Sequence, residues 1–428
     1  MTINRRKFIT GVGAAAAASS VLGRTTPTAH AQSDMPLHDA LKKFVIYGGG
    51  VRASQLVRNP YHFRRGHSAV LHKVTLNDEA ITQTIVRATG AHYPFVSAKH
   101  DRISIFGLYS PECVILDMDH KVVKAFTAPE GYIFSGHGLL LEGTDNLLVG
   151  LYRTKPQTIK DEGMLMVINI AGEPKIESTM PSHGLQPHDM AYLPGKESIV
   201  LAHAGSTLDH YGDKEHRYLH EIINPGLTVL DAKTLNMKKF VRIPNTAEVS
   251  HLAPRDDGQV LCCLNQKLNI SALNKGMADA VINDEFKGMD FVISDMEFED
   301  RNYGISLPLP SVLVNLETGK TTDFMPAPNH QRQGQTVAFH SATRTSVVSY
   351  IRSGGLLFLD ADGKSEAIHS RDIGLYHVSG LTDLPGTPYM AMCGYHNDIS
   401  IVDMRTRKSV HTIRMDMLRA SHIVAHEI

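Results

Sequence analysis

Histidine is the residue type with the most evident chemical potential, since it accounts for 24 of the 428 residues. Imidazole is the commonest metal ligand in proteins and changes its charge near neutral pH. Seven histidines recur in short β-type segments at broadly regular intervals: His92, His137, His188, His251, His340, His377 and His422. If these positions are equivalent in a repeated unit, the seven imidazoles converge on one place. The predicted chemistry is therefore binding of a transition metal or a metallocofactor.

The donor type narrows the choice of metal. Imidazole nitrogen suits copper, iron and zinc, of which we expect copper or iron ahead of zinc, whereas calcium needs oxygen ligands. Asp189 directly follows His188, and we expect its carboxylate to orient a neighbouring imidazole. His210 lies in a polar segment, residues 203–225, which we expect to form a long rim loop that adds cofactor-binding groups.

Two other roles for the histidines stay open. They can hydrogen-bond neighbouring repeats as structural residues, or they can line a funnel for a polar organic ligand. No catalytic residue is predicted, because the sequence contains no HExxH, GxSxG, P-loop or GxGxxG motif. Whether the protein is an enzyme is left open.

A recurring apolar segment, expected to be a strand, defines the repeated unit in which these histidines occur. It usually ends in Asp or Asn and leads into a polar turn. The copies are Cys113–Asp117, Leu165–Asn169, Leu227–Asp231, Val312–Asn315, Leu356–Asp360 and Ile399–Asp403, with a looser one at Ser68–His72. Short strands at such a period are typical of a β-propeller. We predict an all-β fold in which each copy is the third strand of a four-stranded blade.

The number of blades is predicted to be seven or eight. The step from His251 to His340 is the longest, and it contains a weak strand copy, Leu268–Ala272, and a segment around Asp290 in place of a histidine. These features indicate one additional blade. We expect the C-terminal strand Ser421–His426 to join Phe44–Tyr47 in a shared blade, which closes the ring and removes the open edges.

The N-terminus has the features of an export signal. Arg5 and Arg6 precede an apolar stretch, Gly11–Leu22, and a small-residue cleavage site that ends at Ala31. This order is typical of a twin-arginine (Tat) signal peptide. We therefore expect residues 1–31 to be removed and residues 32–428 to form a periplasmic propeller. The Tat translocase is its partner during export, and no later segment has the length of a membrane span.

The charge and the cysteine pattern argue against a nucleic-acid-binding protein, a thiolate zinc site and a covalently bound haem. A formal net charge of −1 with no block of like charge argues against a nucleic-acid partner. The chain has no CxxC pair for a thiolate zinc site or a covalent haem. Cys262 and Cys263 are adjacent in an apolar run, so we expect them to point to opposite faces of a strand as small core residues.

One part of the sequence resembles a known family. The segments that carry the resemblance are Gly136–Gly138, Ser182–Asp189 and Asn224–Leu227. They resemble the Tat-exported bacterial propellers classed as a domain of unknown function, which are often encoded near imelysin-type iron-uptake proteins. The resemblance implies a periplasmic propeller, iron or copper handling, and periplasmic iron-uptake components as partners. The histidine arrangement is also similar to that of nitrous oxide reductase, by analogy only.

Together these features predict a periplasmic propeller that binds a transition metal through histidines lining its central channel. Its role would lie in iron or copper handling or in redox chemistry. The alternatives are a metal-independent binding scaffold with structural histidines, and a propeller hydrolase or lactonase.

Overall fold

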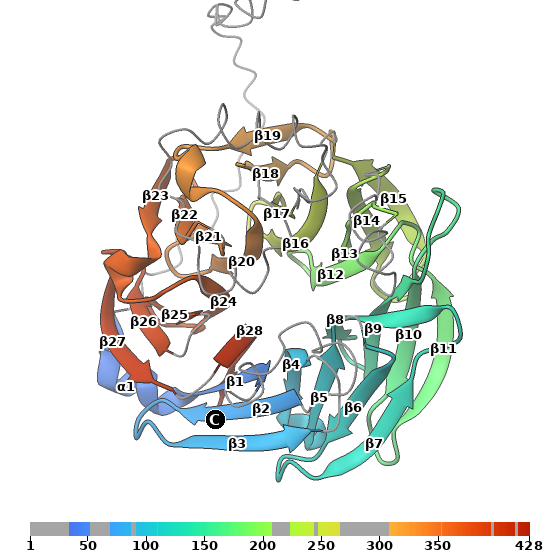
Figure 1. Ribbon diagram of the computed structural model, residues 1–428, viewed down its shortest axis with the longest axis horizontal. Helices are drawn as coiled ribbons and strands as arrows, with labels where there is room; N and C mark the ends of the chain where they lie inside the picture. The colour runs from blue at the N-terminus through green and yellow to red at the C-terminus, as the bar shows by residue number, and fades with distance from the viewer. Residues whose placement is uncertain are drawn as a thin grey trace, which may run out of the picture. The chain divides into compact units, whose positions relative to one another are not determined.

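Seven four-stranded antiparallel sheets are arranged in a ring (Figure 1). The computed structural model describes residues 34–51, 69–86, 91–108, 110–207, 223–243, 247–265, 308–351, 353–394, 398–415 and 418–428. All of them belong to one unit, Gln32–Ile428. The predicted β-propeller is thus confirmed. The predicted signal peptide, residues 1–31, lies outside the described residues.

Each blade is named here by its innermost strand. The β28 blade consists of β28 (Leu418–Glu427), β1 (Phe44–Val51), β2 (Ala69–Thr75) and β3 (Ile81–Val86). The β4 blade consists of β4 (Ala91–Ser97), β5 (Arg102–Gly107), β6 (Glu112–Leu116) and β7 (Val122–Thr127). The β8 blade consists of β8 (Tyr132–Leu140), β9 (Asn146–Arg153), β10 (Met164–Asn169) and β11 (Lys175–Pro181).

The next four blades follow in chain order. The β12 blade has β12 (Pro187–Tyr192), β13 (Ser198–His203), β14 (Gly226–Asp231) and β15 (Met237–Arg242). The β16 blade has β16 (Glu248–Pro254), β17 (Val260–Asn265), β18 (Ser311–Val314) and β19 (Thr321–Phe324). The β20 blade has β20 (Gly334–His340), β21 (Thr345–Tyr350), β22 (Gly355–Leu359) and β23 (Ser365–His369). The β24 blade has β24 (Val378–Asp383), β25 (Tyr389–Gly394), β26 (Asp398–Asp403) and β27 (Lys408–Arg414).

Helical structure is sparse in the described residues. A short helix, α1 (Leu37–Lys43), precedes β1 and inserts Ala40 into the adjacent core. Single 3-10 turns occur at Ala98–His100, Pro328–His330 and Ser370–Ile373. No helix in this part of the chain is long and apolar enough to cross a membrane.

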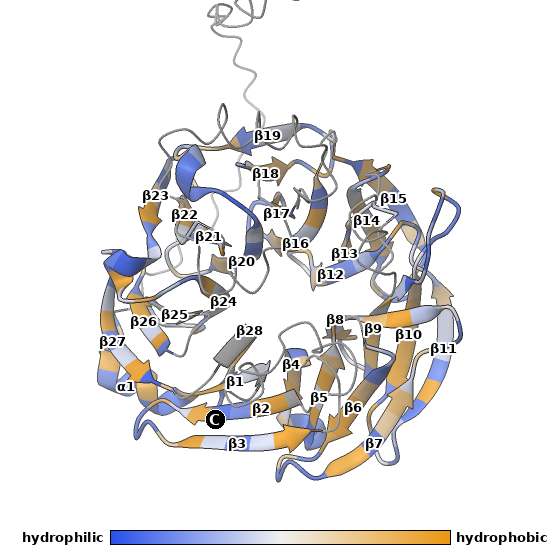
Figure 2. Cartoon of the chain, viewed as in Figure 1, coloured by the Kyte–Doolittle hydropathy of each residue, from blue (hydrophilic) through white to orange (hydrophobic). Residues whose placement is uncertain are grey.

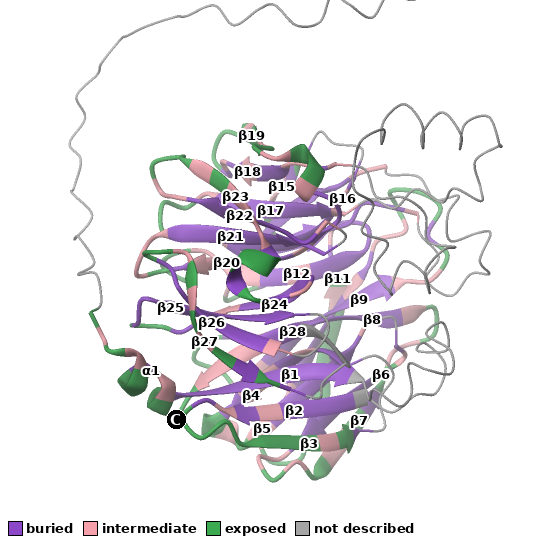
Figure 3. Ribbon diagram, turned by 60° about the vertical axis from the view of Figure 1, so that its left-hand side comes forward, coloured by how far each residue is buried: buried purple, intermediate pink, exposed green. Residues whose placement is uncertain are grey.

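The recurring apolar strand of the sequence is the third strand of every blade, as predicted. The copies coincide with β2, β6, β10, β14, β18, β22 and β26. Figure 2 shows that middle strands such as β9 and β10 are largely hydrophobic. Figure 3 shows that β9 is buried, and β10 is buried likewise, while outer strands such as β3 and β11 are mostly exposed. A strand packed between two neighbouring blades is apolar on both faces, and this accounts for the continuous apolar runs.

Seven hydrophobic clusters hold the ring together, one at each junction between neighbouring blades. Strand β17 shows how one strand serves two junctions. Cys262 packs toward the β12 blade, and Cys263 packs toward the β20 blade. All four cysteines are buried and free, as expected for small core residues.

Strands from both ends of the chain close the ring. β28 pairs antiparallel with β1, and Gly49 lies opposite His422 in the register. The expected shared blade is therefore confirmed. The run Gly48–Gly50 lies inside β1, where a Cβ atom on Gly49 would approach the backbone of Ala91 at 3.0 Å. A glycine is needed there because β1 passes close to β4.

The structure has seven blades in its described residues, so the lower of the two predicted numbers is right. β17 and β18 pair directly, with Cys262 opposite Val312. Residues 266–307, which include Leu268–Ala272 and Asp290, lie outside the described residues and connect two adjacent strands of one blade. The long step from His251 to His340 therefore contains an insertion within a blade.

Candidate metal centre

A register shift interrupts the innermost strand of every described blade. Such a shift marks a β-bulge, which leaves residues outside the regular pairing and redirects their side chains. In the β4, β8 and β12 blades the shifted residues include His92, His137 and His188. His251 directly follows the shift in β16, and His422 borders the shift in β28. The bulges therefore direct five imidazoles toward one place.

The five imidazoles form a closed circuit of ring contacts. Centroid distances around the circuit are 4.3 Å for His92–His422, 4.7 Å for His422–His251, 4.5 Å for His251–His188, 4.7 Å for His188–His137 and 4.9 Å for His137–His92. The five residues are only 3–5% exposed. They come from five consecutive blades, and the β20 and β24 blades contribute none. We call these five residues the histidine cluster.

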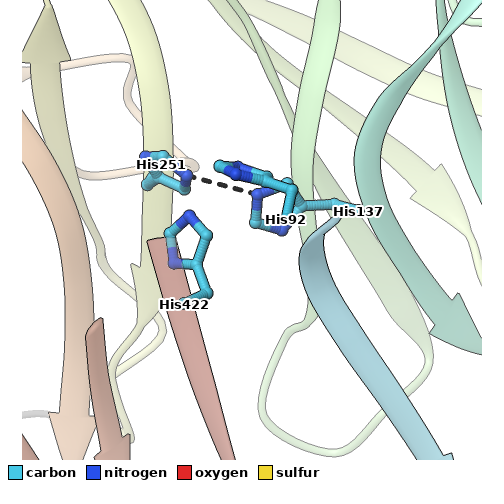
Figure 4. Close-up of side chains that lie close together, drawn as sticks. All are labelled: His92, His137, His251 and His422. Carbon is cyan, nitrogen blue, oxygen red and sulfur yellow. Dashed lines mark hydrogen bonds between the residues drawn. The ribbon is translucent and has the colours of Figure 1, made fainter. Parts of the chain in front are cut away.

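Ring nitrogens converge inside the histidine cluster. The Nε2 atom of His251 lies 3.1 Å from Nε2 of His188 and 3.2 Å from Nε2 of His137. Donor nitrogens of His92, His137, His251 and His422 all lie within 4.8 Å of one another (Figure 4). Two imidazoles on a tetrahedral metal, at metal–nitrogen distances near 2.0–2.1 Å, place their nitrogens about 3.3 Å apart. The two Nε2–Nε2 distances at His251, 3.1 and 3.2 Å, are close to this value.

The outer nitrogens of the same rings have partners of their own. Nδ1 of His137 lies 3.2 Å from a carboxylate oxygen of Asp189, and Nδ1 of His188 contacts the Tyr152 hydroxyl. Nδ1 of His251 lies 3.9 Å from Sγ of Cys263. Such partners fix the orientation and tautomer of imidazoles that bind metals.

Burial favours the neutral form of four of the five imidazoles. Removal from water lowers the pKa of both His137 and His188 to about 3, and lowers the pKa of His251 and His422 well below the ordinary histidine value. The pKa of Asp189 is raised, again chiefly by burial. Neutral imidazole with a free lone pair is the form that binds metal.

His340 and His377, which the sequence places in the same ring, lie outside the histidine cluster. His340 ends β20, where Nε2 is 3.4 Å from Asp383 and Nδ1 is 2.8 Å from the Thr343 hydroxyl. His377 precedes β24 and pairs through Nδ1 with the carbonyl of Ile351. The bulges of these two blades carry other residues, Gln335 and Ser379. His340 lies five residues after the first and His377 lies two residues before the second, so both histidines are out of phase with the bulges.

His210 lies outside the described residues. The predicted rim loop, residues 203–225, begins one residue later than expected because His203 is the last residue of β13. It joins β13 to β14 within the β12 blade. His203 itself is buried, with Nε2 2.9 Å from the Thr228 hydroxyl.

Three residues beside the cluster were not predicted from the sequence. They are Tyr93, Tyr152 and Cys263. Tyr93 stacks on His137 with ring centroids 5.0 Å apart, and Tyr152 stacks on His188. Cys263 lies opposite His251 in the β16–β17 register. Cys263 could have been found by predicting the β16–β17 hairpin, because that pairing places it opposite His251.

The Gly136–Gly138 motif has a packing role at the centre. Gly136 has φ +98°, and a Cβ atom there would lie 2.5 Å from Cδ2 of His92. A Cβ atom on Gly138 would lie 2.7 Å from the ring of Phe106. Both glycines thus let β8 approach the β4 blade closely on either side of His137.

Part of the chain matches the model of a protein family. Residues 111–286 match the model of a family described as protein of unknown function (DUF1513). The resemblance to an uncharacterised family is thus confirmed over this stretch. No curated protein matches the chain. The matched residues include His137, His188 and His251, and their partners Asp189, Tyr152 and Cys263 also fall inside this DUF1513 segment. His92 and His422 lie outside it.

Proposed function

We propose that this protein binds a transition metal, copper or iron, through the histidine cluster and works in the periplasm. The observation that carries the proposal is that Nε2 of His251 lies 3.1 Å from Nε2 of His188 and 3.2 Å from Nε2 of His137. Their outer Nδ1 atoms are held by other groups. Inward nitrogens with outward orienting partners are the usual arrangement of a histidine metal site.

Proton counting supports a cation at this position. The Asp189 carboxylate favours the tautomer of His137 that carries its proton on Nδ1, which leaves the Nε2 lone pair directed inward. The Nε2 atom of His251 faces two other Nε2 atoms, and a single proton can satisfy only one of these contacts. A cation between the three nitrogens accepts all their lone pairs at once.

The export signal and the family context support the cellular role. A Tat leader carries folded proteins, so a metal inserted into a buried cluster before export is retained. The five imidazoles are 3–5% exposed, which suits holding, transferring or oxidising and reducing the metal. We propose that the partners are periplasmic iron-uptake components.

Metal analysis tests the proposal directly. Protein exported with its own leader is purified, and copper, iron and zinc are measured by plasma mass spectrometry. We expect about one equivalent of copper or iron per chain in the wild type, and less than a tenth of this in the double variant His137→Ala/His188→Ala. The matched controls are His340→Gln, a buried histidine outside the cluster, and His38→Gln, an exposed one. Both should keep their metal.

Equal and negligible metal in the wild type and the double variant would contradict the proposal. Purification of a partner with metal-free wild-type protein would instead support a scaffold with structural histidines. Circular dichroism of each variant shows whether a loss of metal reflects a loss of fold.

A further inference from the structure

We infer that the histidine cluster selects monovalent copper, Cu(I), over divalent ions. This inference rests on the proposed metal-binding function and names the metal and its oxidation state. It is carried by three features of the described residues: the chemical type of the donor atoms, the number of acidic side chains beside them, and the packing of the rings.

The converging donor atoms are all imidazole nitrogens. The group that gathers within 4.8 Å contains His92, His137, His251 and His422, with no carboxylate and no thiol. The sulfur of Cys263 contacts the outer nitrogen of His251. Non-haem iron sites commonly combine histidines with a carboxylate ligand, and manganese prefers oxygen ligands. An all-imidazole set leaves copper and zinc as the better candidates.

The charge around the cluster matches a single positive charge. Among the described residues, Asp189 is the acidic side chain that contacts the cluster. Its Oδ1 also accepts a hydrogen bond from the amide of Met190, and its Oδ2 accepts one from the amide of Leu252. One carboxylate and one monovalent ion make a neutral centre. A divalent ion would leave one uncompensated charge among side chains removed from water, which is costly.

A small anion from solvent would be the other way to neutralise a divalent ion. Catalytic zinc sites use it: three protein ligands hold the ion, and the fourth position stays open for water or hydroxide. Here five imidazoles close a circuit, with successive centroids 4.3–4.9 Å apart. The gathered nitrogens of His92, His137, His251 and His422 already equal the four that a four-coordinate ion uses, and an anion would have to displace one of them. Cu(I) needs no anion and accepts three or four nitrogens.

The test compares ions on metal-free wild-type protein. Cu(I) is titrated anaerobically in competition with the coloured chelator bicinchoninate, and Zn(II) and Fe(II) are titrated separately. We expect Cu(I) to bind at least a hundredfold more tightly than Zn(II) or Fe(II). We also expect copper bound in air to stay Cu(I), with no electron paramagnetic resonance signal and a Cu(I) X-ray absorption edge.

Two partly buried carboxylates provide a matched pair of variants. Asp189 and Asp383 each contact a histidine, and their side chains are 18% and 20% exposed. We expect Asp189→Asn to lower Cu(I) affinity ten- to a hundredfold, the usual effect of removing a partner of a metal-binding imidazole. Asp383→Asn, beside His340, should leave the affinity unchanged.

The outcomes separate the two levels of the proposal. Tighter binding of Zn(II) or Fe(II) than of Cu(I), or oxidation of bound copper to Cu(II) in air, overturns the inference and leaves a metal site in place. Full Cu(I) affinity in a folded Asp189→Asn variant overturns the charge argument. Failure of every metal to bind the wild type removes the proposed function itself.

Discussion

Asp189 of β12 faces His137 of β8 across a junction between two blades, with 3.2 Å between Oδ1 and Nδ1. The other oxygen, Oδ2, accepts a hydrogen bond from the amide of Leu252 in β16 at 3.2 Å. One carboxylate thus connects the innermost strands of three consecutive blades. These are the blades that supply His137, His188 and His251. The carboxylate that orients the His137 imidazole therefore also fixes the spacing of the strands that carry these three histidines.

This connection predicts a loss of stability when Asp189 is removed. In Asp189→Ala, Nδ1 of His137 and the amide of Leu252 lose their acceptor in a buried setting. We expect the free energy of unfolding of the metal-free protein to fall by about 2–4 kcal/mol, as for buried groups left unsatisfied. Urea unfolding followed by circular dichroism measures it. Asp119→Ala, at a side chain that is 80% exposed, should change stability by about 0.5 kcal/mol or less.

Gly136 gives a second prediction, which concerns the position of His92. In Gly136→Ala the new methyl group would lie 2.5 Å from Cδ2 of His92, and the backbone has φ +98°. We expect the imidazole to be displaced and metal binding to weaken at least tenfold. Gly143→Ala is the control, because its φ of +71° is also positive and nothing lies within 4 Å of the new methyl group. Equal metal affinity in the two variants would show that His92 is not needed.

The propeller and its closure could be predicted from the sequence because the patterns that indicate them lie within single short segments. Each third strand is an apolar run, and most of these runs end in Asp or Asn and lead into a turn, as at Leu356–Asp360. This pattern persists whatever the length of the connecting loops. Five of the seven expected channel histidines also reach the cluster. Their positions could be inferred because each lies within an innermost strand.

His340 and His377 were misplaced because counting residues between strands does not fix the phase within a strand. The phase depends on where the bulge lies, at Gln335 in β20 and Ser379 in β24. A bulge depends on the pairing of two strands, so a single strand does not reveal it. The same limit applies to the stretch 266–307, whose place between β17 and β18 follows only from their pairing. Contacts between blades, such as Tyr152 with His188, depend on packing at long sequence distance.

A third prediction concerns Arg407, whose ion pairs are expected to stabilise the contact between two neighbouring blades. Its guanidinium lies 2.7 Å from a carboxylate oxygen of Asp360, contacts Glu366, and sits 5.2 Å from the ring centre of Phe358. This joins the β24 blade to the β20 blade. We expect Arg407→Ala to lower the free energy of unfolding by about 1–3 kcal/mol, because the partly buried network loses its cation. Lys196→Ala, which breaks an exposed pair with Glu142, should cost about 0.5 kcal/mol or less. Urea unfolding compares the two, and equal losses would contradict the prediction.

A fourth prediction concerns His72 in β2, whose burial makes the free energy of unfolding depend on pH. Its side chain is buried, neither ring nitrogen has a hydrogen-bond partner among the described residues, and burial lowers its pKa to about 4. The unfolded chain takes up the proton near pH 6.5, before the folded protein does. The contribution of neutral His72 is therefore complete above pH 6.5 and is lost as pH falls toward 4. Between pH 7.5 and 5 this should cost about 2 kcal/mol.

The variant His72→Leu isolates this contribution, since leucine fills a similar buried space and does not titrate. We expect the metal-free variant to lose about 2 kcal/mol less stability than the wild type between pH 7.5 and 5. Urea unfolding at both pH values provides the measurement. His38→Leu, at an exposed histidine, should keep the wild-type dependence on pH. If His72→Leu and the wild type lose stability equally on acidification, proton uptake by other buried histidines accounts for the whole effect and His72 makes no contribution.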